Sequence, residues 1–184
     1  DLGRECLGCY GGESYPTPHL DRLSEEGTRF EACYATPMCS PTRVMLMTGR
    51  FNFRNYTAWG KVDLDGPSLA RSLKKAGYAT GGFGKWGLGD VETSGVPEKH
   101  GFDEFFGYYD QVHAHTYYPS FYWRNSQKIP LKNDPPVPGH ARLPDGADPL
   151  DSASYASFKG QDYTPEHMLD AALQFVRDNK DNPF

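Results

Sequence analysis

Residues 39–50 read Cys39-Ser40-Pro41-Thr42-Arg43-Val44-Met45-Leu46-Met47-Thr48-Gly49-Arg50. This stretch predicts a short helix, because Pro41 suits a first helical turn, where its missing N–H costs no hydrogen bond. The run from Val44 to Met47 is apolar on every side, which is typical of a helix packed inside a domain. Gly49 stands where a left-handed residue commonly ends a helix. We therefore expect a buried helix with a reactive side chain, Cys39, at its entrance.

Cys39 and Ser40 would lie beside the free N–H groups and the positive end of the helix dipole, which is a natural site for anions. Arg43 follows one turn later and adds a full positive charge. An isolated cysteine in this position is open to two other interpretations, a buried structural residue or a reactive thiolate at a helix N-terminus. The residues on either side of Cys39 are needed to distinguish these interpretations.

The whole stretch resembles the signature of the type I sulfatases, C-x-P-S/T-R followed some residues later by T-G-R. In that family the cysteine is oxidised after synthesis to formylglycine, an aldehyde that is present in the site as a geminal diol. The resemblance implies that one hydroxyl of the diol attacks sulfur and carries the sulfate as a covalent intermediate. The second hydroxyl lets this intermediate collapse to aldehyde and free sulfate, which a serine or a cysteine could not do. Cys39, as formylglycine, is therefore the expected nucleophile.

A second signature follows at Gly84-Lys85-Trp86-Gly87-Leu88-Gly89, which resembles the family sequence G-K-W-H-L-G. In the family the lysine binds the sulfate and the histidine assists turnover of the diol. Lys85 matches, but Gly87 stands in place of the histidine and has no side chain to carry a proton. Either another residue takes over this role or the enzyme is impaired.

The segment Gln111-Val112-His113-Ala114-His115-Thr116-Tyr117-Tyr118-Pro119 offers a replacement. It follows residues 101–108, which resemble the family sequence G-F-D-x-F-F-G, and some sulfatases with glycine at the altered position carry a similar A-H-x-Y-Y-P segment. Our hypothesis is that His115 takes over the acid–base or hydrogen-bonding role near the diol, with His113 as second choice, because histidine titrates near neutral pH. The alternative is a structural or substrate-pocket histidine. A metal pair of His113 and His115 is weaker, because no further ligand lies nearby in the sequence.

The expected metal site rests on the resemblance alone. Asp1-Leu2-Gly3 matches the second of two adjacent aspartates that precede Leu-Gly in the family and bind calcium. Asp1 and the modified Cys39 are thus the expected ligands for Ca²⁺, with Mg²⁺ as the less expected ion, and the ion would act as a Lewis acid on the ester. Cys6-x-x-Cys9 has no second pair and is interpreted as two incidental thiols. A disulfide among Cys6, Cys9 and Cys33 stays open.

Composition predicts a globular domain, and the charge is unevenly spread along the chain. The chain has 184 residues, of which 38% are hydrophobic and 14% aromatic, and no run of 18 apolar residues that would span a membrane. The net charge of −5 argues against general nucleic-acid binding. Residues 43–85 nevertheless carry eight Lys and Arg against two Asp. An anionic substrate is a sensible partner for this block, although solvated helix surfaces account for Lys74 and Lys75.

Alternating helix and strand patterns predict a layered α/β fold with a mostly parallel central sheet. Helices are expected over 17–27, with Leu20 and Leu23 facing inward, and over 67–76. Strands are expected over 28–35 and over 78–84, and the second of them delivers Lys85 to its carboxyl end, where ligands bind in such sheets. Further along, the sequence predicts three features: a hairpin over 121–131, a long surface loop over 133–157, and a helix from Thr164 with a buried stripe of Leu169, Ala172, Leu173 and Val176.

The resemblance covers residues 1–109 closely and the rest more loosely. It implies that residues 1–184 are the N-terminal portion of a catalytic domain of the alkaline-phosphatase-like sulfatase fold, truncated at both ends and inactive alone. The implied function is hydrolysis of sulfuric esters, with Arg43 holding the diol and Lys85 a sulfate oxygen. The aromatic and basic segment 108–132 favours a sulfated polysaccharide as substrate. The resemblance also implies a formylglycine-generating enzyme as partner and a periplasmic or secreted location.

Three alternatives stay open at this point. A phosphodiester or phosphonate hydrolase of the same superfamily can use the same nucleophile. An inactive homologue would bind sulfated glycans without turnover. A thiol-dependent enzyme would keep Cys39 unmodified and would be blocked by alkylation.

Overall fold

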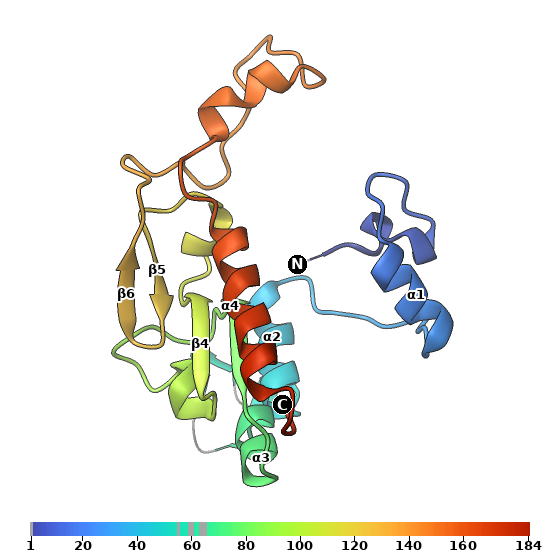
Figure 1. Cartoon of the computed structure of the whole chain (residues 1–184), viewed down its shortest axis with the longest axis vertical. Helices are drawn as coiled ribbons and strands as arrows, with labels where there is room; N and C mark the ends of the chain where they lie inside the picture. Colours follow the sequence, from blue (N-terminus) through green and yellow to red (C-terminus); the bar gives the residue numbers. More distant parts are fainter. Residues whose placement is uncertain (1, 55, 59–60, 63–65) are drawn as a thin grey trace. The chain divides into compact units, whose positions relative to one another are not determined.

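The computed structural model describes residues 2–54, 56–58, 61–62 and 66–184. The chain divides into two compact units between Cys39 and Ser40 (Figure 1). Asp1, one of the expected metal ligands, lies outside the described residues.

The first unit is organised around one helix. Its elements are η1 (Arg4–Cys6), η2 (Gly8–Tyr10) and α1 (Pro18–Glu26). Asp21 on α1 accepts hydrogen bonds from the backbone N–H of Cys9 at 2.7 Å and from the hydroxyl of Thr17 at 3.0 Å. These bonds fasten the glycine-rich loop to the helix. The helix predicted over 17–27 is confirmed, including its end at Gly27.

Two other predictions for this unit are wrong. Leu20 and Leu23 are 46% and 65% exposed, so they do not face a core. Residues 28–35 form no strand, and Tyr34 within them is 93% exposed. The physical reason is the same in both cases, because a strand needs a paired edge and a leucine face needs a covering element. The described residues of this unit supply neither.

The second unit is built on a mixed sheet with the strand order β3-β4-β5-β6. Its strands are β3 (Gly81–Lys85), β4 (Glu104–Tyr108), β5 (Phe121–Arg124) and β6 (Gln127–Pro130). β3 and β4 are parallel, with Lys85 opposite Tyr108, and the other two pairs are antiparallel. The expected strand ending at Lys85 and the expected hairpin are confirmed. The layered α/β class is also confirmed, although β3–β4 is the one parallel pair among the described strands.

The remaining elements of the second unit surround this sheet. A small antiparallel ribbon is formed by β1 (Tyr56–Ala58) and β2 (Lys61–Val62). The α-helices are α2 (Cys39–Thr48), α3 (Leu69–Lys75) and α4 (Thr164–Asn179). Short 3-10 turns are η3 (Asn52–Arg54), η4 (Pro97–His100), η5 (His113–His115) and η6 (Ser152–Phe158). The last of them interrupts the long loop predicted over 133–157. No helix within the described ranges is both long enough and apolar enough to cross a membrane.

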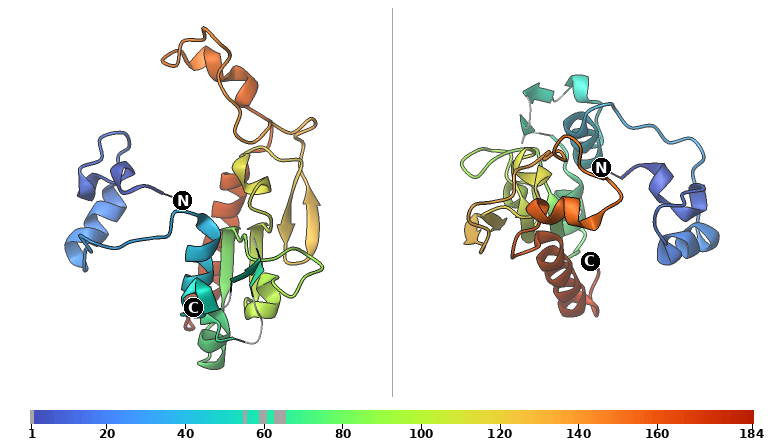
Figure 2. Two further views of the ribbon diagram at one scale, coloured as in Figure 1. Left: turned by 180° about the vertical axis from the view of Figure 1, so that it is seen from behind. Right: turned by 90° about the horizontal axis from the view of Figure 1, so that it is seen from above.

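Helix α4 lies along β3 and β4 (Figures 1 and 2). Its Phe175 ring packs against Phe83 of β3, with ring centroids 5.7 Å apart, and His167 packs against Tyr122 of β5 at 5.8 Å. The predicted buried stripe is therefore wrong, and Leu169, for example, is 57% exposed. At 100° per residue, the centre of the stripe lies about 110° around the helix from Phe175, so the stripe is turned away from the sheet.

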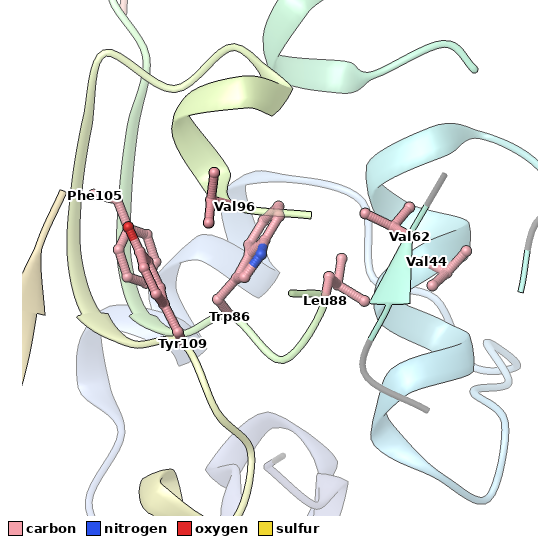
Figure 3. Packing of buried hydrophobic residues seen from close by; sticks show 7 residues of the cluster. All are labelled: Val44, Val62, Trp86, Leu88, Val96, Phe105 and Tyr109. Atoms are coloured by element: carbon pink, nitrogen blue, oxygen red, sulfur yellow. The ribbon is translucent and has the colours of Figure 1, made fainter. Parts of the chain in front are cut away.

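The core of the second unit joins α2 to the sheet and to the segment that follows β3. Seven buried side chains form it, as Figure 3 shows: Val44, Val62, Trp86, Leu88, Val96, Phe105 and Tyr109. The indole N–H of Trp86 donates to the carbonyl of Gly95 at 2.7 Å, so this polar atom is satisfied inside the core. Leu46 on α2 is 64% exposed. The expectation of a helix buried on all sides is thus wrong, because the core reaches α2 from the side of Val44.

Candidate active site

Helix α2 begins at Cys39, the predicted nucleophile position. Pro41 falls within its first turn, and the helix ends as expected. The N–H of Gly49 donates to the carbonyl of Met45 at 2.8 Å, and Gly49 has a φ of 66°. A left-handed φ is one that glycine adopts without the steric cost of a Cβ atom. Local sequence chemistry therefore sets both ends of the helix that carries position 39.

Arg43 connects this helix to the end of β3. Its Nη1 donates to the backbone carbonyl of Lys85 at 2.5 Å and to that of Trp86 at 3.3 Å. Hydrogen bonds from a charged donor are stronger than neutral ones. The contact brings the two sequence signatures together, because Arg43 belongs to the first and Lys85 to the second.

The parallel pairing of β3 and β4 continues beyond both strands. The N–H of Trp86 donates to the carbonyl of Tyr108 at 2.8 Å, and the N–H of Gly87 donates to that of Tyr109 at 2.9 Å. The segments that follow the two strands consequently run side by side at the carboxyl edge of the sheet. This pairing brings Gly87 next to the start of the segment 111–119.

Gln111 makes the closest contact between these segments, and the sequence analysis did not single it out. Its Nε2 donates to the carbonyl of Gly87 at 2.9 Å and also to the hydroxyl of Ser40, the second residue of α2. All three residues are buried. The one signal in the sequence was that Gln111 opens the segment already chosen for its histidines.

His115 lies on η5, and its surroundings are charged. Its Nδ1 is 2.7 Å from Nε2 of His140, which comes from the long loop. Burial, the neighbouring His140 and the positive charge of Lys85 together lower the pKa of His115. The electrostatic effect of Lys85 indicates that the two predicted site residues lie in the same neighbourhood. The sequence analysis missed His140, because nothing in its loop pointed to η5.

His113 lies in different surroundings. Its ring packs against Phe121, with centroids 4.4 Å apart, and edge-on against Tyr108 at 5.2 Å. Burial is the main cause that lowers the pKa of His113. Its buried Nε2 has no hydrogen-bond partner among the described residues. These contacts favour a packing role for His113 and leave His115 as the better candidate for proton transfer.

The described residues do not make up a metal site. No cluster of three or more His, Cys, Asp or Glu side chains that could hold an ion is found within them. Of the two expected calcium ligands, Cys39 is described and Asp1 is not. The described donors are thus too few to hold Ca²⁺ on their own. Cys6, Cys9 and Cys33 form no disulfide with one another.

Two cavities lie in the second unit. The smaller one, of about 150 Å³, adjoins Gly87 and Gln111 and is lined also by Lys61, Asp90 and Asp110. The larger one, of about 350 Å³, lies between α4 and the sheet and is lined by Glu104, Asp170 and Asp178 together with Arg124 and His167.

Proteins similar to this chain are found both by sequence and by structure. The profile of the sulfatase family matches residues 1–184. Steryl-sulfatase from Mus musculus is 39% identical over 127 residues, which cover 58% of this chain and 20% of the relative. N-acetylgalactosamine-6-sulfatase from Homo sapiens is 43% identical over 123 residues, which cover 58% and 23%. The chain therefore spans about a fifth of the length of these curated relatives.

Among solved structures, BT4656 in complex with its substrate D-glucosamine-2-N,6-O-disulfate is similar along the whole chain. The TM-score is 0.70 at 25% sequence identity, and the match covers 100% of this chain and 31% of that one.

Proposed function

Because the chain belongs to the sulfatase family, we propose that the protein hydrolyses sulfuric esters, with formylglycine made from Cys39 as its nucleophile. The observation that carries this proposal is the contact of Arg43 with the backbone of Lys85. It joins the helix that begins at position 39 to the end of the strand that presents Lys85. A nucleophile, an arginine and a lysine from two distant signatures then serve one site.

The charges of this site suit a sulfate group. Lys85 ends β3 at the carboxyl edge of the sheet, where ligands bind in α/β folds. The first turn of α2 adds N–H groups and the positive end of its dipole. Lys85 holds a sulfate oxygen, and Arg43 offsets negative charge at the diol in addition to holding the strand end.

The reaction follows from the two hydroxyls of the diol. One hydroxyl of the diol loses its proton and its oxygen attacks sulfur while the bond from sulfur to the ester oxygen breaks, and the leaving alcohol takes up a proton. The second hydroxyl then loses its proton, the bond between the diol carbon and the sulfated oxygen breaks, and sulfate leaves. Water restores the diol from the aldehyde. The nucleophile is regenerated without an attack of water on sulfur.

His115 is proposed as the acid–base group of this site, which the glycine at position 87 cannot provide, and as the proton donor to the leaving alcohol. It lies within the electrostatic reach of Lys85, and His140 contacts its Nδ1 at 2.7 Å. This contact occupies Nδ1 and leaves Nε2 as the ring nitrogen that exchanges a proton with the reacting groups. The packed environment of His113 makes it the weaker choice.

A sulfated glycan is proposed as substrate. BT4656, which resembles this chain over its full length, was solved with a disulfated glucosamine as its substrate. Within the segment from Tyr108 to Lys132, exposed aromatic and basic side chains such as Tyr117 and Lys128 are of the kind that bind sugar rings and sulfate groups.

Ca²⁺ is proposed as the metal ion of the complete site, with Asp1 and the modified Cys39 as two of its ligands. Hard oxygen donors such as a carboxylate and a diol suit this ion. When bound, it would supply Lewis-acid polarisation of the ester. Binding of Ca²⁺ by the full-length protein and by its Asp1→Asn variant, measured calorimetrically, tests this assignment.

The test of the main proposal uses the full-length protein produced together with a formylglycine-generating enzyme. Mass spectrometry of the peptide with residue 39 measures the conversion, and 4-nitrophenyl sulfate and 4-nitrophenyl phosphate serve as competing substrates. We expect conversion of Cys39, faster hydrolysis of the sulfate, and a loss of at least about 10³-fold in Cys39→Ala. Cys33→Ala is the matched control, because Cys33 is exposed. An unmodified thiol together with sulfate release blocked by iodoacetamide would refute the proposal, as would preference for the phosphate.

A further inference from the structure

The side chain of Gln111 is buried between two segments that the proposed reaction depends on. It is 2% exposed, and it comes from the segment that follows β4. On one side it contacts Ser40, which is 0% exposed and directly follows the proposed nucleophile in α2. On the other side it contacts Gly87, two residues after Lys85.

The chemistry of these partners determines how the amide is oriented. A backbone carbonyl can only accept hydrogen bonds, so the atom of Gln111 that lies 2.9 Å from the Gly87 oxygen has to be the NH₂ group. The same nitrogen donates to the hydroxyl of Ser40. That hydroxyl lies 3.5 Å from the Gly87 oxygen, which closes a triangle of three buried polar groups. A buried polar group that loses its partner is destabilised, so the three groups hold one another in place.

The space beside Gly87 is also taken by Gln111. Gly87 has a φ of 73°, and a Cβ atom built on it would lie 2.6 Å from Cγ of Gln111. Carbon atoms do not approach so closely without displacement. The side chain that fills this part of the site therefore comes from position 111, and position 87 has to remain without one.

We propose that Gln111 is a positioning residue that fixes the entrance of α2 to the segment after β3 and so holds the nucleophile at position 39 in register with Lys85. The proposal rests on the proposed function, because it assigns Gln111 a part in the same site. It predicts an effect on the chemical step. Binding of the ester relies on the positive charges of Lys85 and Arg43, which a substitution at position 111 leaves in the protein, whereas attack on sulfur depends on the separation of nucleophile and bound sulfate.

The alternative is that the side chain of Gln111 only fills space and has no part in positioning residue 39. Gln111→Met separates the two possibilities in the full-length protein, because methionine has a similar length and shape but no donor for Ser40 or Gly87. We expect kcat for 4-nitrophenyl sulfate to fall about 30-fold while KM stays within about threefold. Gln127→Met on the exposed strand β6 is the matched control and should leave both constants unchanged. Conversion of residue 39, measured by mass spectrometry, should be equal in all three proteins.

A second variant gives a readout that loss of packing would not produce. In Gln111→Glu the ionised carboxylate turns two acceptor oxygens toward the carbonyl of Gly87, whereas the protonated form can donate one hydrogen bond. The ratio of kcat in this variant to kcat in the wild type should therefore rise at least about threefold from pH 8 to about pH 5. A ratio that does not change with pH contradicts the proposal.

A third measurement does not depend on turnover. Hydrogen exchange of the peptide spanning residues 84–90 should accelerate about tenfold in Gln111→Met and not in Gln127→Met. If the wild type cleaves no sulfate ester, the proposed function fails. The exchange measurement still tests whether Gln111 fixes the entrance of α2 to the segment after β3. A wild-type kcat in Gln111→Met, or unchanged exchange in that variant, overturns the assignment of Gln111.

Discussion

The guanidinium of Arg43 donates a hydrogen bond to the backbone carbonyl of Lys85 across 2.5 Å, although 42 residues separate them in the chain. Each residue belongs to a different sequence signature, and each comes from a different layer of the fold. The bond brings the two signatures into contact. It also means that Arg43 has a structural duty at the end of β3 besides its proposed electrostatic one.

Replacing Arg43 by lysine tests this double duty. A lysine keeps the charge but cannot donate to the carbonyls of Lys85 and Trp86 with the planar geometry of a guanidinium. We expect Arg43→Lys to lower kcat/KM for an aryl sulfate about 100-fold and the free energy of unfolding by about 2 kcal/mol. Arg142→Lys, in the exposed part of the long loop, serves as control. Urea unfolding and steady-state kinetics check both effects, and wild-type kinetics in Arg43→Lys would contradict them.

The contact between His115 and His140 is expected to influence how kcat depends on pH. Burial, His140 and Lys85 lower the pKa of His115, so a donor role for its protonated form is lost at a lower pH than for an ordinary histidine. Removing a second imidazole relieves the repulsion on the protonated form, so His140→Ala should raise this pKa. We expect the alkaline limb of the kcat profile to move to higher pH in His140→Ala and to stay in place in His19→Ala.

The same histidine can be removed directly. His115→Ala should lower kcat for sulfate esters about 100-fold, in line with the loss of a general acid. Its effect should shrink for esters whose leaving alcohol is very acidic, because such a group needs no proton. Equal sulfate release by wild type and His115→Ala across a series of leaving groups would rule out the role.

Gly87 and Gly146 form a natural pair for measuring the cost of a Cβ atom. Both have a left-handed φ, 73° and 84°, but a Cβ at Gly87 would meet Gln111 whereas one at Gly146 would meet nothing within 4 Å. Gly87→Ala should lower the free energy of unfolding by about 3 kcal/mol, and Gly146→Ala by about 1 kcal/mol. Chemical denaturation measures the difference. Equal costs at the two positions would show that Gln111 does not fill the space.

The carboxylate of Asp103 is expected to make the free energy of unfolding depend on pH. Burial alone would raise the pKa of Asp103, but hydrogen bonds from Lys74 and Thr80 outweigh it and lower this pKa. A lowered pKa in the folded state stabilises the fold above the unfolded value and loses this effect as the pH falls through the folded value. Asp103→Asn should therefore destabilise the protein by about 1 kcal/mol at pH 7, a small value because the ion pair is exposed to solvent.

The control for this prediction is Asp181→Asn, near the end of the chain. The difference between the two variants should shrink as the pH falls through the lowered pKa of Asp103, because its carboxyl then becomes protonated in the folded wild type. A difference that persists into acid would mean that the charge of Asp103 has no part in it.

The sequence by itself determined the elements whose signals are local. The helix that begins at Cys39 and ends before Gly49, the strand that ends at Lys85 and the hairpin turn at Asn125 all follow from proline, glycine and capping positions within a few residues. Such signals do not depend on what packs against the element. The predicted roles of Cys39, Lys85 and His115 likewise came from short contiguous motifs.

Only the tertiary structure decided which faces are buried and which distant side chains meet. The leucines of α1 and α4 show the right period but are exposed, because burial depends on a partner that periodicity does not name. The 28–35 segment fails as a strand for the same reason. Gln111 reaches Ser40 across 71 residues of chain, and His140 reaches His115 across 25. Contacts of this length arise from how β3, β4 and α2 pack together, and no local pattern in the sequence encodes them.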